Sequence, residues 1–169
     1  WVRLEWRIPS RGLVGIRTEF LTETRGAGMM HTTSDGYEPW FGDLKTRAHG
    51  VLVADRRGVT TSNALEDLEP RGTLFLGAGI EVYEGMIVGE NARIEEMNVN
   101  PTKEKKLTNM RASGSDDTVK LTPPTIFSLE QALEFIADDE AVEVTPKSVR
   151  LRMTVLNQTD RARARKKNS

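Results

Sequence analysis

Residues 91–124 follow neither the helical nor the strand periodicity for long, although they make up a large part of the chain. They contain Pro101, Pro123 and Pro124 and the polar run 113–117. So long an irregular stretch is uncommon inside a compact domain, where it is usually functional or disordered. Regular structure must therefore come mainly from the residues on either side of it.

The first part of the sequence predicts a strand, a helix and a second strand. Apolar residues alternate over residues 1–8, as in a strand, and their spacing over 11–23 is that of an amphipathic helix. Gly26 and Gly28 favour the end of this helix, and residues 29–33 favour a returning strand. This order predicts half of a split β-α-β domain. Because the strand pattern begins at the first residue, without an initiator methionine, we expect a fragment of a longer protein.

Short strands dominate the remaining regular sequence. Four apolar runs favour strands: 51–54, 59–63, 73–76 and 80–88. The turn residues between the first two runs predict a hairpin. After the irregular stretch, Ser128 and Gln131 match a capping box that opens a helix, and residues 149–155 alternate apolar residues with arginines.

These patterns predict an α+β fold. We expect a partial ferredoxin-like β-α-β unit, followed by a mostly β domain with one main helix and a long functional loop. The corresponding parts of the chain are residues 1–47, residues 48–157 and a basic flexible tail at 158–169. A polar stretch before Gly50 marks the first boundary.

The composition narrows the class of protein. Hydrophobic residues make up 37% and charged residues 29% of the chain, with a net charge of -1, which excludes a wholly disordered chain. The absence of cysteine excludes disulfides, thiolate nucleophiles and cysteine-based metal sites. No apolar run is long enough to cross a bilayer. We therefore expect a cytoplasmic protein without structural metal and without a membrane partner.

Enzyme signatures are incomplete in this sequence. There is no GxxxxGK[ST] phosphate loop, and the glycine pairs at 26–28 and 77–79 lack the third glycine of a dinucleotide fingerprint. His31 and His49 are the only imidazoles, and neither has a partner at ligand spacing. We expect no catalytic residue, no metal ligand and no cofactor in this chain.

Basic and polar side chains predict RNA binding in two places. The irregular stretch carries Lys103, Lys105, Lys106, Asn109, Arg111 and Ser113, and the last alternating segment carries Lys147, Arg150 and Arg152. Lysine and arginine bind phosphates, while amide and hydroxyl groups bond ribose hydroxyls or base edges. On composition alone, a solvated loop with ordinary surface lysines explains the first group equally well. The loop also lacks an aromatic residue on which a base could stack.

Four segments resemble motifs of the TypA/BipA ribosome-binding GTPases. They are residues 81–89 (EVYEGMIVG), 105–114 (KKLTNMRASG), 129–136 (LEQALEFI) and 143–152 (EVTPKSVRLR). Residues 7–15 and 35–39 are similar to the second half of the ferredoxin-like domain V shared with elongation factor G. The remainder resembles the C-terminal domain peculiar to the family, so the resemblance spans essentially the whole chain.

The resemblance implies a function on the ribosome. Members of the family bind the 70S ribosome, hydrolyse GTP, and act in stress response and large-subunit assembly. Their C-terminal domain reaches toward the peptidyl-transferase centre and contacts the acceptor end of A-site tRNA. Carried over to this chain, the resemblance implies 23S rRNA and tRNA as partners, with no DNA, and contacts through Lys103, Lys105, Lys106, Asn109 and Arg111. The domain that would bind GTP and Mg²⁺ is absent, so we expect no GTP hydrolysis here.

A protein-interaction module is the main alternative. From Ser128 to Glu143 every charged residue is acidic, so a helix over 128–140 could bind a basic ribosomal protein. The lysines of the irregular stretch would then be merely solvated. A hidden hydrolase is a third reading, which the missing nucleophile–base pairs disfavour.

Overall fold

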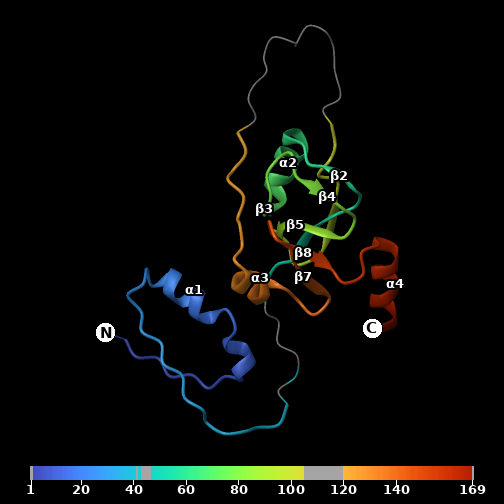
Figure 1. The fold of residues 1–169 in the computed structure, drawn as a ribbon. Helices are drawn as coiled ribbons and strands as arrows, with labels where there is room; N and C mark the ends of the chain where they lie inside the picture. Colours follow the sequence, from blue (N-terminus) through green and yellow to red (C-terminus); the bar gives the residue numbers. More distant parts are fainter. Residues whose placement is uncertain (1, 41, 43–46, 105–119, 169) are drawn as a thin grey trace. The chain divides into compact units, whose positions relative to one another are not determined.

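The computed structural model describes residues 2–40, 42, 47–104 and 120–168. They fall into two compact units, residues 1–46 and 47–169, each of which is described by itself (Figure 1). None of the helices in the described part of the chain has the length and apolar character needed to cross a bilayer.

The first unit contains the predicted helix. A short 3-10 helix, η1 (Ser10–Leu13), precedes α1 (Ile16–Glu23). The end of α1 is fixed by Gly26, which has a φ of 78° and donates its backbone N–H to the Leu21 carbonyl at 2.7 Å. A glycine in this left-handed conformation is a common helix terminator, so the predicted stop is confirmed.

The two strands predicted beside this helix are not formed. Residues 2–8 and 29–33 lie in extended or irregular backbone without a paired strand, and no described residue of the first unit is buried. A strand requires a neighbour for its backbone hydrogen bonds, and the described residues of this unit supply none. Exposed ion pairs link the segments instead, with Arg7 lying 2.6 Å from Asp35 and 2.8 Å from Glu38.

A six-stranded sheet forms the centre of the second unit. Its strands are β1 (Val51–Ala54), β3 (Gly72–Leu74), β5 (Met86–Asn91), β6 (Met97–Val99), β7 (Glu140–Val144) and β8 (Val149–Met153). The strand order is β6-β1-β5-β8-β7, with β3 also pairing with β5. Only β1 and β6 pair in parallel, and the other pairs are antiparallel. The mixed α+β class is thus confirmed.

Strand β1 does not form the predicted hairpin with the next strand. Its four residues are all buried and it pairs with β5 and β6, so it is a central strand of the sheet. Strand β2 (Gly58–Val59) pairs instead with β4 (Glu81–Val82) in a separate two-stranded sheet. Strand β6 also corrects the expectation that residues 91–124 lack regular structure.

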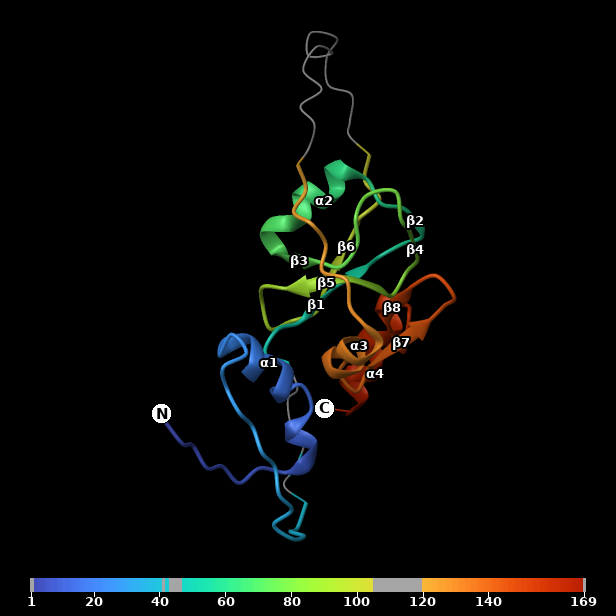
Figure 2. The ribbon, with the colours of Figure 1, turned by 60° about the vertical axis from the view of Figure 1, so that its left-hand side comes forward.

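Two hydrophobic cores lie on the two faces of the large sheet. Leu52 and Ala54 point into the core that contains α2 (Ser62–Leu68), whereas Val51 and Val53 point into the core that contains α3 (Leu129–Phe135). The views in Figures 1 and 2 show these two helices on opposite sides of the strands. Because β1 is covered on both faces, it reads as a continuous apolar run rather than an alternating one.

Helix α3 begins where the sequence predicts. The Ser128 hydroxyl accepts from the Gln131 backbone N–H at 3.3 Å, and the Gln131 side chain accepts from the Ser128 N–H at 2.9 Å. This confirms the capping box. The helix ends at Phe135, earlier than predicted, and Phe135 packs with Phe75 and Phe127 at ring-centroid distances of 5.3 and 5.1 Å.

Residues 158–168, expected to belong to a flexible tail, form helix α4 (Gln158–Asn168). Its anchor is Arg161, which is 4% exposed and lies 2.8 Å from Glu96. The same guanidinium donates to Asn98 at 2.5 Å and to the carbonyl oxygens of Val155 and Leu156. The described part of the second unit therefore has α2, α3 and α4, instead of the one main helix expected.

Replacing Gly72 with alanine should destabilise the second unit. A Cβ at this position would overlap the carbonyl oxygen of Glu90 on the neighbouring strand β5. Overpacking of this kind costs about 1–3 kcal/mol or more, because backbone must move to relieve it. Urea unfolding should show this loss for Gly72→Ala but not for Gly77→Ala, where a Cβ meets nothing within 4 Å. Equal stability of the two variants would contradict the packing described.

Replacing Arg161 with alanine should detach α4. Removal of Arg161 leaves the buried Glu96 side chain with Arg165 as its one remaining ion-pair partner among the described residues, and breaking a buried ion pair costs about 3 kcal/mol. We expect amide hydrogens of α4 and β6 to exchange faster in Arg161→Ala. The matched control is Arg163→Ala, whose exposed pair with Asp160 contributes little. Unchanged exchange in the first variant would show that α4 is held by other contacts.

Candidate nucleic-acid interface

The chain segment from Asn100 to Lys103 is fixed against the start of α2. Pro101 is fully buried, and its carbonyl accepts from the Thr61 backbone N–H at 3.1 Å. The Thr61 hydroxyl donates to the Lys103 carbonyl at 2.6 Å. Asn100 closes the turn by accepting from the backbone N–H and the hydroxyl of Thr102 at 3.0 and 2.9 Å. We call this segment the outgoing limb.

The segment from Lys120 to Thr125, the return limb, is held near the other end of α2. The Thr122 backbone N–H donates to the carboxylate of Glu69, the residue that follows α2. Leu121 packs against the core that contains α2, and the Thr125 N–H donates to the Leu74 carbonyl at 2.9 Å. Thr61 is the N-cap of α2, so one limb is fixed at each end of the same helix (Figure 1).

Lys103 is the one predicted contact residue that the outgoing limb itself carries. Its ammonium nitrogen lies 3.3 Å from an Asp67 carboxylate oxygen, and the two side chains are 56% and 61% exposed. An exposed pair of this kind contributes only about 0–1 kcal/mol, so it competes weakly with a phosphate. The Lys103 ammonium is therefore accessible to a ligand.

The remaining predicted residues of this segment lie outside the residues that the structure describes. They are Lys105, Lys106, Asn109, Arg111 and Ser113. Their role in RNA binding, and the long functional loop that they belong to, stay predictions from the sequence.

The predicted alternation in β8 is confirmed. Leu151 and Met153 are buried, whereas Arg150 and Arg152 are half-buried on the other face of the strand. Lys147 is exposed in the turn between β7 and β8. The hairpin therefore gathers these three cations, as the sequence indicates.

Arg150 and Arg152 also belong to an internal charged group. They lie near Glu143, whose carboxylate accepts a hydrogen bond from the Tyr83 hydroxyl. Burial, followed by the hydrogen bond and charge of Glu143, raises the pKa of Tyr83, while Arg152 and Arg150 oppose the rise. The two arginines thus interact electrostatically with Tyr83 within the protein, so their charge is only partly available to a ligand.

The two groups of cations are separate. Lys103 lies beside α2 with Asp67, and Lys147 lies in the β7–β8 turn. Figures 1 and 2 both show α2 well apart from β7 and β8. The described structure thus does not combine all of the predicted contact residues in one patch.

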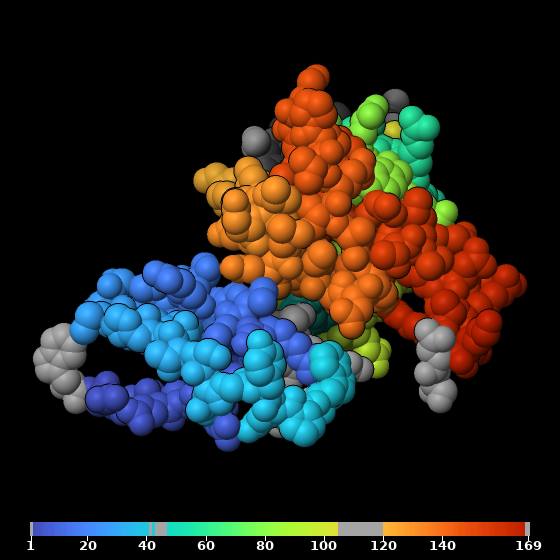
Figure 3. All heavy atoms as spheres, turned by 60° about the horizontal axis from the view of Figure 1, so that its bottom comes forward, coloured from blue at the N-terminus to red at the C-terminus, as the bar shows by residue number. Residues whose placement is uncertain are grey.

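Helix α4 adds basic residues that the sequence analysis did not include among the contact residues. Its exposed cations are Arg163, Arg165, Lys166 and Lys167. Arg165 also lies 2.6 Å from Glu96 and 3.0 Å from Asp139, and Figure 3 shows α4 at the surface of its unit, coloured red. Asn157 is the sequence feature that could have predicted this helix. Its side chain accepts from the N–H groups of Thr159 and Asp160, as helix-capping residues do.

Two family models match consecutive parts of the chain. The TypA/BipA C-terminal domain matches residues 49–158, and the elongation factor G C-terminus matches residues 1–48. These matches confirm the resemblance drawn from the sequence motifs.

Several curated relatives are named large ribosomal subunit assembly factor BipA. The proteins of Salmonella typhimurium, Escherichia coli strain K12 and Haemophilus influenzae are 52%, 51% and 51% identical to this chain. Each match covers 96% of this chain and 27% of the relative. The chain thus spans about a quarter of the length of these relatives.

Tyr83 should ionise at a higher pH than an unperturbed tyrosine, because burial and Glu143 raise its pKa. The folded state then holds this proton more tightly than the unfolded state. The resulting stabilisation is complete below the unfolded value of about 10, and is lost as the pH rises through the folded-state pKa. An ultraviolet titration of tyrosinate should contain a late component that Tyr83→Phe removes. A wild-type curve without that component would contradict the arrangement.

Proposed function

The chain belongs to the TypA/BipA family, and we propose that it is the ribosome-binding C-terminal region of a large ribosomal subunit assembly factor. In this proposal it contacts 23S rRNA and the acceptor end of A-site tRNA near the peptidyl-transferase centre of the 70S ribosome. The whole protein is a GTPase that acts in subunit assembly and stress response in the cytoplasm. GTP and Mg²⁺ bind in a nucleotide-binding domain, and this chain itself binds no cofactor and catalyses no reaction.

The observation that carries this proposal is the fixing of both limbs on α2. Thr61 holds the outgoing limb and Glu69 holds the return limb, so the segment between them starts and ends on a rigid support. That segment carries Lys105, Lys106 and Arg111. A rigid support lowers the entropy lost when a cationic segment binds, because its ends are already ordered.

RNA is the ligand class that these side chains favour. Lysine supplies a point charge and arginine a bidentate fork for phosphate, and together they displace counterions from a nucleic-acid backbone. Lys103 adds an accessible ammonium at the base of the segment. RNA is therefore favoured over a protein partner, because the charge of these side chains is positive and accessible.

The acidic alternative is less well supported, because two carboxylates of the acidic run 128–143 already have partners within the protein. Glu140 is buried and its oxygens accept from Arg47 at 2.9 and 2.7 Å. Glu143 accepts a hydrogen bond from the Tyr83 hydroxyl, whereas the pair of Asp139 with Arg165 is exposed and leaves Asp139 accessible. These contacts leave less negative charge available to a basic partner than the sequence indicates.

Helix α3 itself carries only two acidic residues, Glu130 and Glu134. Hydrogen bonds from its own backbone N–H and from the Ser128 hydroxyl lower the pKa of Glu130, so this carboxylate is ionised at neutral pH. Two carboxylates on a two-turn helix form a small docking surface for a ribosomal protein.

Removing two cations of the segment should weaken ribosome binding. In the full-length protein, Lys105→Ala combined with Arg111→Ala removes about two phosphate contacts, so the slope of log K against log salt should fall by about 1.4 to 1.8. Sedimentation with ribosomes and filter binding of tRNA at several salt concentrations measure this slope. The thermal unfolding of the variant should match that of the wild type.

The acidic alternative predicts the opposite pattern. Glu130→Lys combined with Glu134→Lys would then abolish association, while the Lys105 and Arg111 variant would bind normally. Wild-type affinity of the latter across the whole salt titration would count decisively against RNA recognition by the segment.

A further inference from the structure

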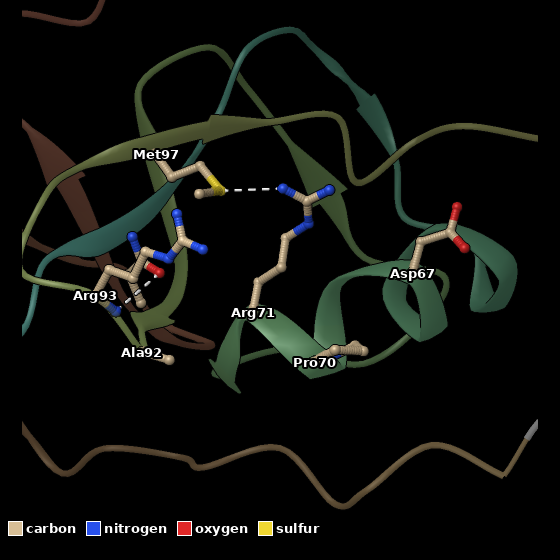
Figure 4. Close-up of a pocket in the computed structure, with 7 residues that line it drawn as sticks. Asp67, Pro70, Arg71, Ala92, Arg93 and Met97 are labelled. Carbon is tan, nitrogen blue, oxygen red and sulfur yellow. Dashed lines mark hydrogen bonds between the residues drawn. The ribbon is translucent and has the colours of Figure 1, made fainter.

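A surface pocket of about 430 Å³ lies beside α2, and neither the sequence motifs nor the proposed contacts include it. Its walls come from the short 3-10 helix η2 (Glu69–Arg71), the end of β5 and the start of β6. Arg71 and Arg93 enter it from different segments, and Figure 4 shows both guanidinium groups on the same side of the pocket as Met97.

The backbone that carries the two arginines is fixed. The Ala92 N–H donates to the Arg71 carbonyl at 2.8 Å, which ties the two arginine-bearing segments together. The Arg93 carbonyl accepts from the Gly50 N–H at 2.7 Å. Asn91 is buried, and its side chain accepts from the Arg93 N–H at 3.2 Å and donates to the Glu95 carbonyl at 2.6 Å. Hydrogen bonds of the backbone and of Asn91 therefore hold the two arginines at the same pocket. The guanidinium groups take no part in these bonds.

The guanidinium groups are not neutralised by described carboxylates. Arg71 donates to the Met97 sulfur at 3.3 Å, and within the described residues neither arginine forms an ion pair. Asp67 is the one acidic residue lining the pocket, and its carboxylate lies 3.3 Å from Lys103. The pocket therefore has an excess of positive charge, and two neighbouring arginines repel each other unless an anion lies between them.

We propose that Arg71 and Arg93 form a binding site for a phosphate group of an RNA strand. Planar guanidinium forks match the oxygens of a phosphodiester, and hydrogen bonds of this kind are among the stronger ones in proteins. The pocket volume exceeds that of one phosphate, so part of the attached nucleoside fits as well. The site rests on the proposed function, since it takes the same class of ligand.

The position of the pocket favours a continuous RNA strand over a free anion. Glu69 of η2 holds the return limb, and Asp67 of α2 pairs with Lys103 of the outgoing limb. The pocket and the base of the segment thus share one support. Because Asp67 both lines the pocket and pairs with Lys103, one RNA strand can contact Lys103 and the two arginines together.

The test uses the 169-residue chain and the double variant Arg71→Gln plus Arg93→Gln. Apart from the Met97 contact, this change removes no side-chain hydrogen bond or ion pair among the described residues, so the variant should unfold like the wild type. Fluorescence anisotropy with a labelled single-stranded oligouridylate should show about tenfold weaker binding at low salt. The side-chain Nε–H signals of Arg71 and Arg93 in ¹⁵N spectra should shift when the oligonucleotide is added to the wild type. Inorganic phosphate in a parallel titration distinguishes a free anion, which would shift the same signals at equal concentration.

The matched control is Arg17→Gln plus Arg25→Gln, which removes the same charge from exposed positions in the first unit. Equal loss in both double variants would show that net charge alone is responsible and would overturn the site. If the pocket variant binds like the wild type while Lys105→Ala plus Arg111→Ala does not, the pocket is excluded and RNA recognition by the segment stands. If the wild type does not bind the oligonucleotide at any salt concentration, both proposals fail together.

Discussion

The burial of β1 on both faces is the constraint on which the second unit depends. Its four residues, Val51–Ala54, are at most 2% exposed, and alternate side chains enter two different cores. Removing such a strand from water requires that both of its edges find partners, because unpaired backbone groups are costly in an apolar interior. β5 and β6 provide those partners. β6 leads directly into the outgoing limb and β5 into the turn that carries Arg93, so the positions of both depend on this central pairing.

Local signals in the sequence predict the elements whose structure is set by neighbouring residues. The capping box at Ser128 and the alternation around Leu151 are examples, because a helix start and a half-buried strand each have a short-range pattern. The family resemblance added what these patterns do not contain, namely the proposal that the ribosome is the partner. The resemblance also implied RNA contacts through Lys105, Lys106 and Arg111, which lie outside the described residues.

Contacts between distant residues explain what the sequence did not reveal. Arg161 reads as one more cation of a basic tail, yet its partner Glu96 is far away in sequence and turns it into an anchor. Arg71 and Arg93 come together because β3 pairs with β5, and because the Ala92 N–H beyond that pairing donates to the Arg71 carbonyl. The strands predicted in the first unit failed for the converse reason, since an alternating pattern does not specify a partner. Such relationships have no signature in a single sequence.

The fixing of both limbs on one helix separates the length and charge of the segment between them from the stability of the sheet. Closing a connection between two fixed points costs only about 0.6 kcal/mol more for each doubling of its length, so stability places little constraint on that length. Thr61 and Glu69 fix the two points at which the segment joins the second unit. Changes of length or charge within the segment should therefore alter the choice of ligand more than the stability of the sheet that supports it.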